Sequence, residues 1–194
     1  MTRVIAGTAG GRRLAVPPGR NTRPTSDKAR EAMFSTLEAL RGTIHGARML
    51  DLFGGSGAVG LEALSRGAVH ALLVESDASA ARTIRENVRT LALPGAEVRA
   101  DKAERVIAGP APAAPYDLVF LDPPYAVTDD QVREMLITLG AGGWLAEDVL
   151  VTVERSTRGG DFRWPEGFDG LRSRRYGEGT LWYGRAAVEE DQDS

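Results

Sequence analysis

The sequence predicts an α/β fold in which helices cover both faces of a mostly parallel sheet. From residue 47 onward, short apolar segments typical of strands alternate with segments of helical periodicity. Strands that alternate with helices are joined by right-handed crossovers, so their sheet is parallel. The alternation stops near the end, where strand-like segments 170–176 and 180–185 flank Gly177-Glu178-Gly179. These segments predict an antiparallel hairpin that closes a seven-stranded sheet.

The same patterns locate the individual elements. Apolar runs predict parallel strands, and 3.6-residue periodicity predicts the helices between them. The strands are expected at 47–53, 70–75, 96–100, 116–121 and 149–154, and the helices at 57–66, 78–91, 102–108 and 129–139. The stretch STRGGDFRWPEGF that precedes the hairpin shows no periodicity, so no helix is predicted there.

A small extension precedes this alternating region. Residues 3–16 predict two short strands around a Gly-rich turn. A helix over 26–41 should follow, because Thr25 or Ser26 can cap its first turn and Asp27 is favoured there by the helix dipole. We therefore expect a basic N-terminal hairpin or arm over 1–25, a main domain over 26–187 and an acidic, disordered tail over 188–194.

Charge is distributed unevenly along the chain. The net charge is −3, yet residues 1–30 contain seven basic residues and one acidic residue, a net +6, so the remaining 164 residues carry −9. A basic end on an acidic body indicates a phosphate-binding surface, although a merely solvated arm is an equally good explanation of the charge alone.

Composition excludes several classes of protein. The absence of cysteine rules out disulfides, thiolate metal sites and a cysteine nucleophile. His45 and His70 have no ligand spacing around them, so no metal site is predicted. No apolar run reaches membrane-spanning length, and the N-terminus lacks the apolar stretch of a signal peptide. A cytoplasmic protein without membrane association is expected.

A Gly-rich turn after the first parallel strand predicts a cofactor site. Asp51 stands near the strand end, and Gly55, Gly57 and Gly60 let the backbone approach a ligand. Glu75, which ends the next strand, can accept hydrogen bonds from ribose hydroxyls. The glycine spacing matches a dinucleotide fingerprint, whereas an acid at Asp51 favours S-adenosylmethionine (SAM), whose ammonium it could face. A loop that binds nothing is the remaining alternative.

The segment Asp122-Pro123-Pro124-Tyr125 predicts a second part of the site. It follows the apolar strand 116–121 and so lies where ligands bind in open α/β sheets. The two prolines stiffen the loop and leave carbonyl and carboxylate acceptors beside an aromatic ring. This arrangement suits a planar base that carries an exocyclic amine, and an ordinary proline-rich turn is the structural alternative.

Further segments accompany these two motifs: Arg3-Val-Ile-Ala-Gly7, Gly11-Arg-Arg-Leu14, Thr22-Arg-Pro-Thr-Ser-Asp27, Arg30-Glu-Ala-Met-Phe34, Gly60-Leu-Glu-Ala-Leu-Ser-Arg-Gly67, Trp164-Pro-Glu-Gly167 and Arg175-Tyr-Gly-Glu178. Together they resemble Rossmann-like class I SAM-dependent methyltransferases, and more narrowly the RsmD family of 16S rRNA (guanine-N2) methyltransferases. The DPPY motif alone is shared with adenine-N6 DNA methyltransferases, so the N-terminal Thr22–Asp27 segment narrows the resemblance. Gly54 departs from the family, which often has Ala there.

The resemblance implies roles for individual residues. SAM would be bound at the ends of the first three strands by Asp51, Phe53, Gly55, Gly57, Glu75 and Asp101, although Asp101 could instead cap a helix. The target amine would be held by Asp122 and the Pro123 carbonyl, while Tyr125 stacks on the base. The arm would contact the RNA backbone through Arg3, Arg12, Arg13, Arg20 and Arg23.

The resemblance also implies an activity and a partner. The protein would act as a monomer that methylates N2 of a guanine in 16S rRNA, at position 966, within an assembling or assembled small ribosomal subunit. An adenine-N6 methyltransferase of DNA or RNA with the same DPPY site is the alternative enzyme. An NAD-dependent oxidoreductase and a non-catalytic RNA-binding assembly factor are the other classes considered.

Overall fold

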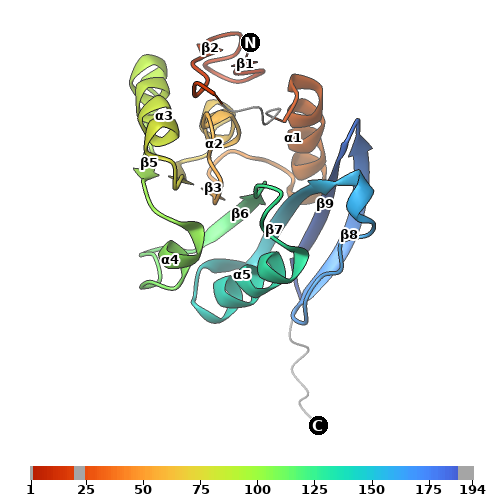
Figure 1. Cartoon of the computed structure of the whole chain (residues 1–194). Helices are drawn as coiled ribbons and strands as arrows, with labels where there is room; N and C mark the ends of the chain where they lie inside the picture. Colours follow the sequence, from red (N-terminus) through yellow and green to blue (C-terminus); the bar gives the residue numbers. More distant parts are fainter. Residues whose placement is uncertain (1, 20–24, 188–194) are drawn as a thin grey trace.

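Seven strands form the central sheet, and all but one of them run in the same direction. They are β3 (Arg48–Asp51), β4 (His70–Val74), β5 (Ala96–Arg99), β6 (Tyr116–Leu121), β7 (Leu145–Ser156), β8 (Phe168–Tyr176) and β9 (Gly179–Ala186). Their order is β5-β4-β3-β6-β7-β9-β8 in the computed structural model, which describes residues 2–19 and 25–187 (Figure 1). β9 pairs antiparallel with both β7 and β8. The predicted sheet and its closing hairpin are confirmed.

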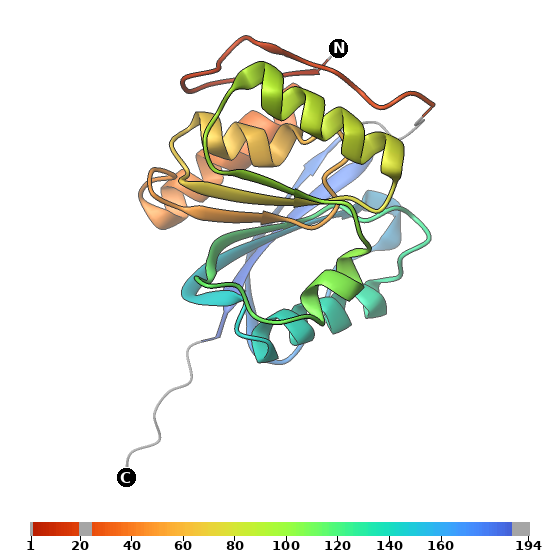
Figure 2. The ribbon, with the colours of Figure 1, turned by 90° about the vertical axis from the view of Figure 1, so that its left-hand side faces the viewer.

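Helices cover both faces of the sheet (Figures 1 and 2). α1 (Asp27–Arg41), α2 (Ala58–Ser65) and α3 (Ala78–Leu91) lie on one face, and α4 (Ala103–Ile107) and α5 (Asp129–Ala141) lie on the other. Because side chains alternate along a strand, neighbouring residues such as Leu73 and Val74 enter opposite hydrophobic cores. This burial on both faces explains why the parallel strands are continuous apolar runs.

Polar side chains at the helix starts fix where the helices begin. The Ser26 hydroxyl accepts from the Ala29 N–H (3.1 Å) at the start of α1, and Asp77 accepts from the Ala80 N–H (2.8 Å) at the start of α3. Ser26 is therefore the N-cap among the two candidates in the sequence. The other candidate, Thr25, donates its hydroxyl proton to Glu154 across the molecule (2.7 Å).

The N-terminal arm packs against the helical layer formed by α1, α2 and α3 (Figure 2). β1 (Thr2–Arg3) pairs antiparallel with β2 (Arg13–Leu14), as the sequence predicts. Val4, Ala9 and Leu14 are buried in the same core as α1 and α2. The arm is thus continuous with the hydrophobic core of the main domain.

A buried ion pair attaches the arm to α1 and α2. The side chains of Arg30 and Glu62 are both completely buried, with Arg30 Nε 3.6 Å from Glu62 Oε2. Glu62 also accepts from Arg66 Nε (2.9 Å) and from the N–H groups of Ile5 (2.8 Å) and Ala6 (3.0 Å). Because both charges are out of water, each needs its partner to offset the cost of desolvation.

The segment before the hairpin contains a 3-10 turn, η1 (Thr157–Gly159), and extended chain, with no α-helix between the described residues 157 and 167. Trp164 covers the hairpin there, stacked on Phe168 and edge-on to Phe162. A Cβ at Gly170 or Gly184 would lie 2.8 Å or 2.7 Å from the indole, so both glycines make room for it. Trp164 therefore packs directly on the backbone of β8 and β9.

Removing the buried carboxylate should destabilise the fold. In Glu62→Ala, Arg30 stays buried without its main counter-charge, and we expect a loss of about 3–5 kcal/mol in the free energy of unfolding, measured in urea. Glu31→Ala removes an exposed carboxylate from α1 and should change that free energy by less than about 0.5 kcal/mol. Equal losses for the two variants would show that the buried ion pair contributes no more to the free energy of unfolding than an exposed carboxylate does.

Candidate active site

One large cavity of about 1160 Å³ opens at the carboxyl ends of the parallel strands. Its walls come from the turns after β3, β4 and β6, from the end of β7, from the start of α1 and from the β8–β9 turn. Register brings these ends together: Asp51 pairs with Phe120, and Leu121 pairs with Val153. The cavity lies at the edge of the sheet where the sequence placed both motifs.

Asp51 is buried at the inner end of the cavity, with 1% of its surface exposed. Burial raises the pKa of this carboxyl to about 7, helped by the neighbouring Glu75 and opposed by the N–H groups of Phe53 and Gly60. Within the described residues, its Oδ1 atom has no hydrogen-bond partner. A buried carboxylate oxygen without a donor suits a cationic ligand group.

The Gly-rich turn joins Asp51 to the next strand end. Gly55 has a φ of +59° and no neighbour where a Cβ would stand, and Gly57 (φ +85°) begins α2. Glu75 accepts from the Gly55 N–H (2.8 Å) and the Asp77 N–H (2.9 Å), which fixes its carboxylate in the cavity wall. Phe53 lines the same wall.

Asp101 lies two residues beyond the end of β5. Its Oδ1 atom accepts from the Lys102 N–H (2.8 Å) and lies 3.1 Å from Arg105 Nη1. Lys102 rather than Asp101 is the N-cap residue of α4, so the alternative that Asp101 caps this helix is not realised. Lys102, Ala103 and Glu104 line the cavity directly, while the contact with the adenine of SAM that the family resemblance implies for Asp101 stays a prediction.

The Asp122-Pro123-Pro124-Tyr125 segment forms the cavity wall after β6. Pro124 O accepts from the Val127 N–H (3.0 Å) and closes a turn. Burial holds the pKa of the Asp122 carboxyl well above its usual range, and the nearby Glu154 and Asp51 carboxylates raise it further, while Arg155 opposes them. Tyr125 has 82% of its surface exposed, so its ring is accessible to a ligand.

Glu154 is a site residue that the sequence patterns did not single out. It lies near the end of β7 and lines the cavity, and burial raises its pKa while the bond from Thr25 opposes that rise. The signal was available: the predicted strand 149–154 ends on this carboxylate at the same edge as Asp122. What the sequence could not show is its contact with Thr25, 129 residues earlier.

The arginines proposed for RNA contact are placed differently from one another. Arg13 is exposed, and the exposed Arg3 pairs with Asp27 (3.1 Å). Arg12 donates to the carbonyls of Thr90 and Leu91 at the end of α3, so it also has a structural role. Arg20 and Arg23 lie outside the described residues, as does the acidic tail.

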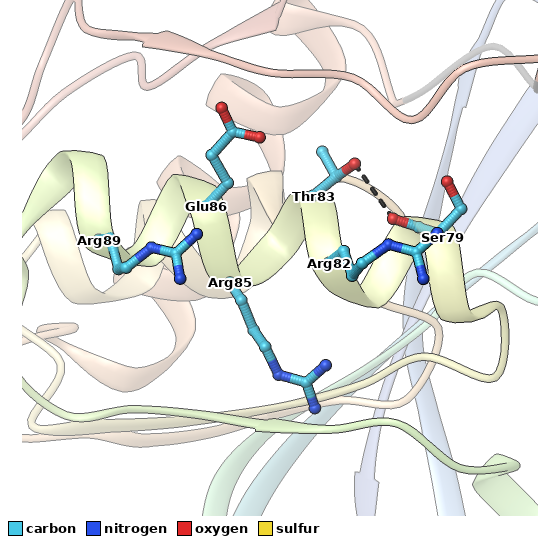
Figure 3. A pocket seen from close by; sticks show the side chains of 6 residues that line it. All are labelled: Ser79, Arg82, Thr83, Arg85, Glu86 and Arg89. Carbon is cyan, nitrogen blue, oxygen red and sulfur yellow. Dashed lines mark hydrogen bonds between the residues drawn. The ribbon is translucent and has the colours of Figure 1, made fainter.

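A second, shallower hollow of about 470 Å³ lies on the outer surface of α3 (Figure 3). Arg82, Arg85 and Arg89 share this surface at helical spacing, and all three are exposed. Within the described residues, none of them forms an ion pair. The hollow is also lined by Glu86, so three positive charges and one negative charge share it, and the helix that carries them lies beside the N-terminal arm (Figure 2).

Neither a metal-binding cluster nor a membrane-spanning helix occurs in the part of the chain that the structure describes. No cluster of three or more His, Cys, Asp or Glu side chains there could hold a metal ion. No described helix is both long enough and apolar enough to cross a membrane.

A sheet of this order, with its antiparallel strand inserted beside the last parallel one and its pocket at the carboxyl edge, defines a Rossmann-like class I methyltransferase. The chain belongs to the family described as Conserved hypothetical protein 95, whose model matches residues 2–185.

Named relatives support the same assignment. The chain is 38% identical over 158 residues to Ribosomal RNA small subunit methyltransferase D of Escherichia coli, covering 81% of this chain and 76% of that protein. It is 34% identical to the Haemophilus influenzae protein of the same name, over 78% of this chain and 77% of the relative. The solved structure of yhhF from Escherichia coli is similar, with a TM-score of 0.84 and 33% identity over 96% of this chain and 98% of that one. The resemblance to the RsmD family is confirmed.

The raised pKa of Asp51 makes a prediction for stability. A carboxyl whose pKa rises from 3.8 to about 7 on folding destabilises the fold as it ionises, by roughly 4 kcal/mol once the pH exceeds both values. Between pH 4 and pH 7, wild type should therefore lose stability relative to Asp51→Asn, whose amide does not titrate. Denaturant unfolding at a series of pH values measures this difference, and parallel curves for the two proteins would contradict it.

Proposed function

We propose that the protein transfers a methyl group from SAM to the exocyclic N2 amine of a guanine in 16S rRNA. The observation that carries the proposal is the single cavity shared by Asp51, Glu75 and the Asp122-Pro-Pro-Tyr125 segment. Two ligands can thus meet there, one at the Gly-rich turn and one at the DPPY loop. The names of the relatives supply the class of RNA.

The residues at the Gly-rich turn fit SAM. The buried Oδ1 atom of Asp51 lacks a donor within the described residues, and an ammonium group would supply one. The open space beside Gly55 lets a ligand approach the backbone, and Glu75 is positioned to face ribose hydroxyls. When bound, SAM supplies an electrophilic methyl group. The enzyme's residues then have to position the amine that receives it.

Asp122 and the Pro123 carbonyl would grip the two N–H bonds of the amine. The amine is a poor nucleophile because its lone pair is delocalised into the ring, and two acceptors favour a pyramidal nitrogen whose lone pair points at the methyl group. Methyl transfer would form the nitrogen–carbon bond as the carbon–sulfur bond breaks, and the electron pair of the broken bond would stay with sulfur. The ionised carboxylate of Asp122 would stabilise the charge developing on nitrogen. Its raised pKa makes that carboxylate a stronger base for the proton that nitrogen releases.

Tyr125 would stack on the target base. A base inside a helix cannot reach a cavity of this kind, so the nucleotide is extruded or already unpaired. The exposed ring of Tyr125 offers a surface for that base at the cavity mouth. An adenine-N6 methyltransferase could use the same acceptors and the same ring, so adenine remains the alternative target base.

Substitution of Asp122 tests the chemistry. Asp122→Ala should lower the single-turnover rate of methylation by about 10²–10³, with SAM affinity little changed, because the contact strengthens in the transition state. Asp122→Asn keeps one acceptor and should be less damaging. Undermodified small ribosomal subunits serve as substrate, and Tyr125→Phe, which keeps the stacking ring, is the nearly silent control. An Asp122→Ala protein with the wild-type rate would disprove the mechanism.

The RNA would lie across the arm and α3. Arg13 on the arm and Arg82, Arg85 and Arg89 on α3 are all exposed, and α3 lies beside the arm (Figure 2). Guanidinium groups suit phosphate because they donate two parallel hydrogen bonds. In this proposal the protein acts as a monomer in the cytoplasm. Its substrate is 16S rRNA that is assembled with protein in the small ribosomal subunit.

Salt dependence of RNA binding tests this surface. Replacing Arg82, Arg85 and Arg89 together with Ala should weaken binding and reduce the slope of log K against log salt by roughly 0.7–0.9 per lost phosphate contact. SAM affinity should not change. Arg133→Ala on α5, across the sheet, is the matched control and should leave the slope as in wild type. An unchanged slope in the triple variant would remove α3 from the RNA surface.

A further inference from the structure

Glu154 has no part in the mechanism described above, yet it stands next to the residue that does the chemistry. β6 and β7 are parallel with Leu121 opposite Val153, so the next positions, Asp122 and Glu154, are neighbours across the strand ends. Adjacent strands lie about 4.8 Å apart, and residues paired in register point to the same face. Two carboxyl groups therefore lie side by side in one cavity wall, and Glu154 is one of the groups that raise the pKa of Asp122.

The structure holds Glu154 in place. Its Oε2 atom accepts from the Thr25 hydroxyl at 2.7 Å, immediately before α1. Its Oε1 atom lies where a Cβ on Gly179 would come within 2.9 Å, so the glycine leaves room beside the carboxyl. The next residue, Arg155, is engaged elsewhere: it bonds to Asp129 (2.7 Å) and to the Val127 carbonyl (2.8 Å). Among the described residues, Thr25 is the only hydrogen-bond partner of the Glu154 carboxylate.

Guanine and adenine differ at the atom next to the amine. On the edge of guanine that pairs with cytosine, the N2 amine is flanked by an N1–H donor. The N6 amine of adenine is flanked by N1, which has a lone pair and no hydrogen. An ionised carboxylate only accepts hydrogen bonds, so it attracts the first edge and repels the second. A site with one acceptor for the N2 amine and one for N1–H would bind guanine. With adenine in the same site, the second acceptor, a buried carboxylate, would have no donor.

We propose that Glu154 accepts a hydrogen bond from N1–H of the target guanine while Asp122 holds the N2 amine, and that Glu154 thereby selects guanine over adenine. This inference rests on the proposed function, since it assumes that a base enters the cavity at the DPPY loop. Thr25 is then a positioning residue, because it orients the carboxylate without touching the base. The link also gives the start of α1 a role in base selection.

The test compares three bases at the target position. Small subunits are reconstituted with rRNA that carries guanine, 2-aminopurine or adenine there. 2-Aminopurine keeps the exocyclic 2-amine but lacks N1–H, so it isolates the proposed contact. Wild type should methylate guanine about tenfold to hundredfold faster than 2-aminopurine, because the loss of one charge-assisted hydrogen bond has an effect of this size. Glu154→Gln, which can both donate and accept, should slow guanine and bring the two rates close together.

Two further variants separate positioning from binding and folding. Thr25→Val should lower the ratio of the guanine rate to the 2-aminopurine rate, but less than Glu154→Gln does. Glu154 remains in this variant, but it has lost the hydrogen bond from the Thr25 hydroxyl. Glu147→Gln changes an exposed carboxylate at the other end of β7 and should match wild type on all three bases. SAM affinity, measured by calorimetry, should be unchanged in all three variants, which shows that the cofactor side of the cavity is intact.

The outcomes distinguish this inference from the function on which it rests. A guanine to 2-aminopurine ratio that is the same in wild type and Glu154→Gln would overturn the role of Glu154, while methylation at guanine N2 would still stand. A Glu154→Gln protein equally inactive on every base, with normal SAM affinity, would also overturn it, because the residue would then act in catalysis. Methylation of adenine and not of guanine by wild type would overturn the proposed function itself.

Discussion

The register among β3, β6 and β7 is the constraint on which the active site depends. Asp51 pairs with Phe120, and Leu121 pairs with Val153. This register brings the carboxylates of Asp51, Asp122 and Glu154 into one cavity wall. A slip of one residue in any of these strands would send its carboxylate to the opposite face, into the core beneath α4 and α5. The apolar strands therefore determine the chemistry as much as the fold, because they set the alignment of the residues that follow them.

A second constraint joins the N-terminus to this site. The buried pair of Arg30 and Glu62 holds the backbone of the arm against α1 and α2. The same helix α1 is capped by Ser26, and Thr25 just before the cap bonds to Glu154 in the cavity. A displacement of α1 would therefore move both the arm and the part of the cavity wall that holds Glu154. The basic arm, α1 and the cavity are therefore parts of one connected structure, in which α1 links the other two.

The features that could be predicted from sequence are those with a local signature. The apolar runs, the helix start at Ser26 and the hairpin turn at Gly177 lie within a few residues of the groups that determine them. Strand-end placement then located Asp51, Glu75 and Asp122 correctly at one edge. The bond from Thr25 to Glu154 and the packing of Trp164 over Gly170 and Gly184 depend on contacts far apart in the chain. Such contacts leave no periodic pattern, so only the folded chain reveals them.

The position of β8 has a consequence for how the protein behaves in a crowded solution. β8 is the last strand of the sheet, so one side of its backbone has no neighbouring strand in the described part of the chain. An open edge of this length is a template for pairing with another copy, the usual first step of aggregation. β8 carries Arg172, Arg174 and Arg175, all exposed, and their mutual repulsion opposes such pairing. The positive charge of this edge strand therefore favours a dispersed protein over an aggregated one.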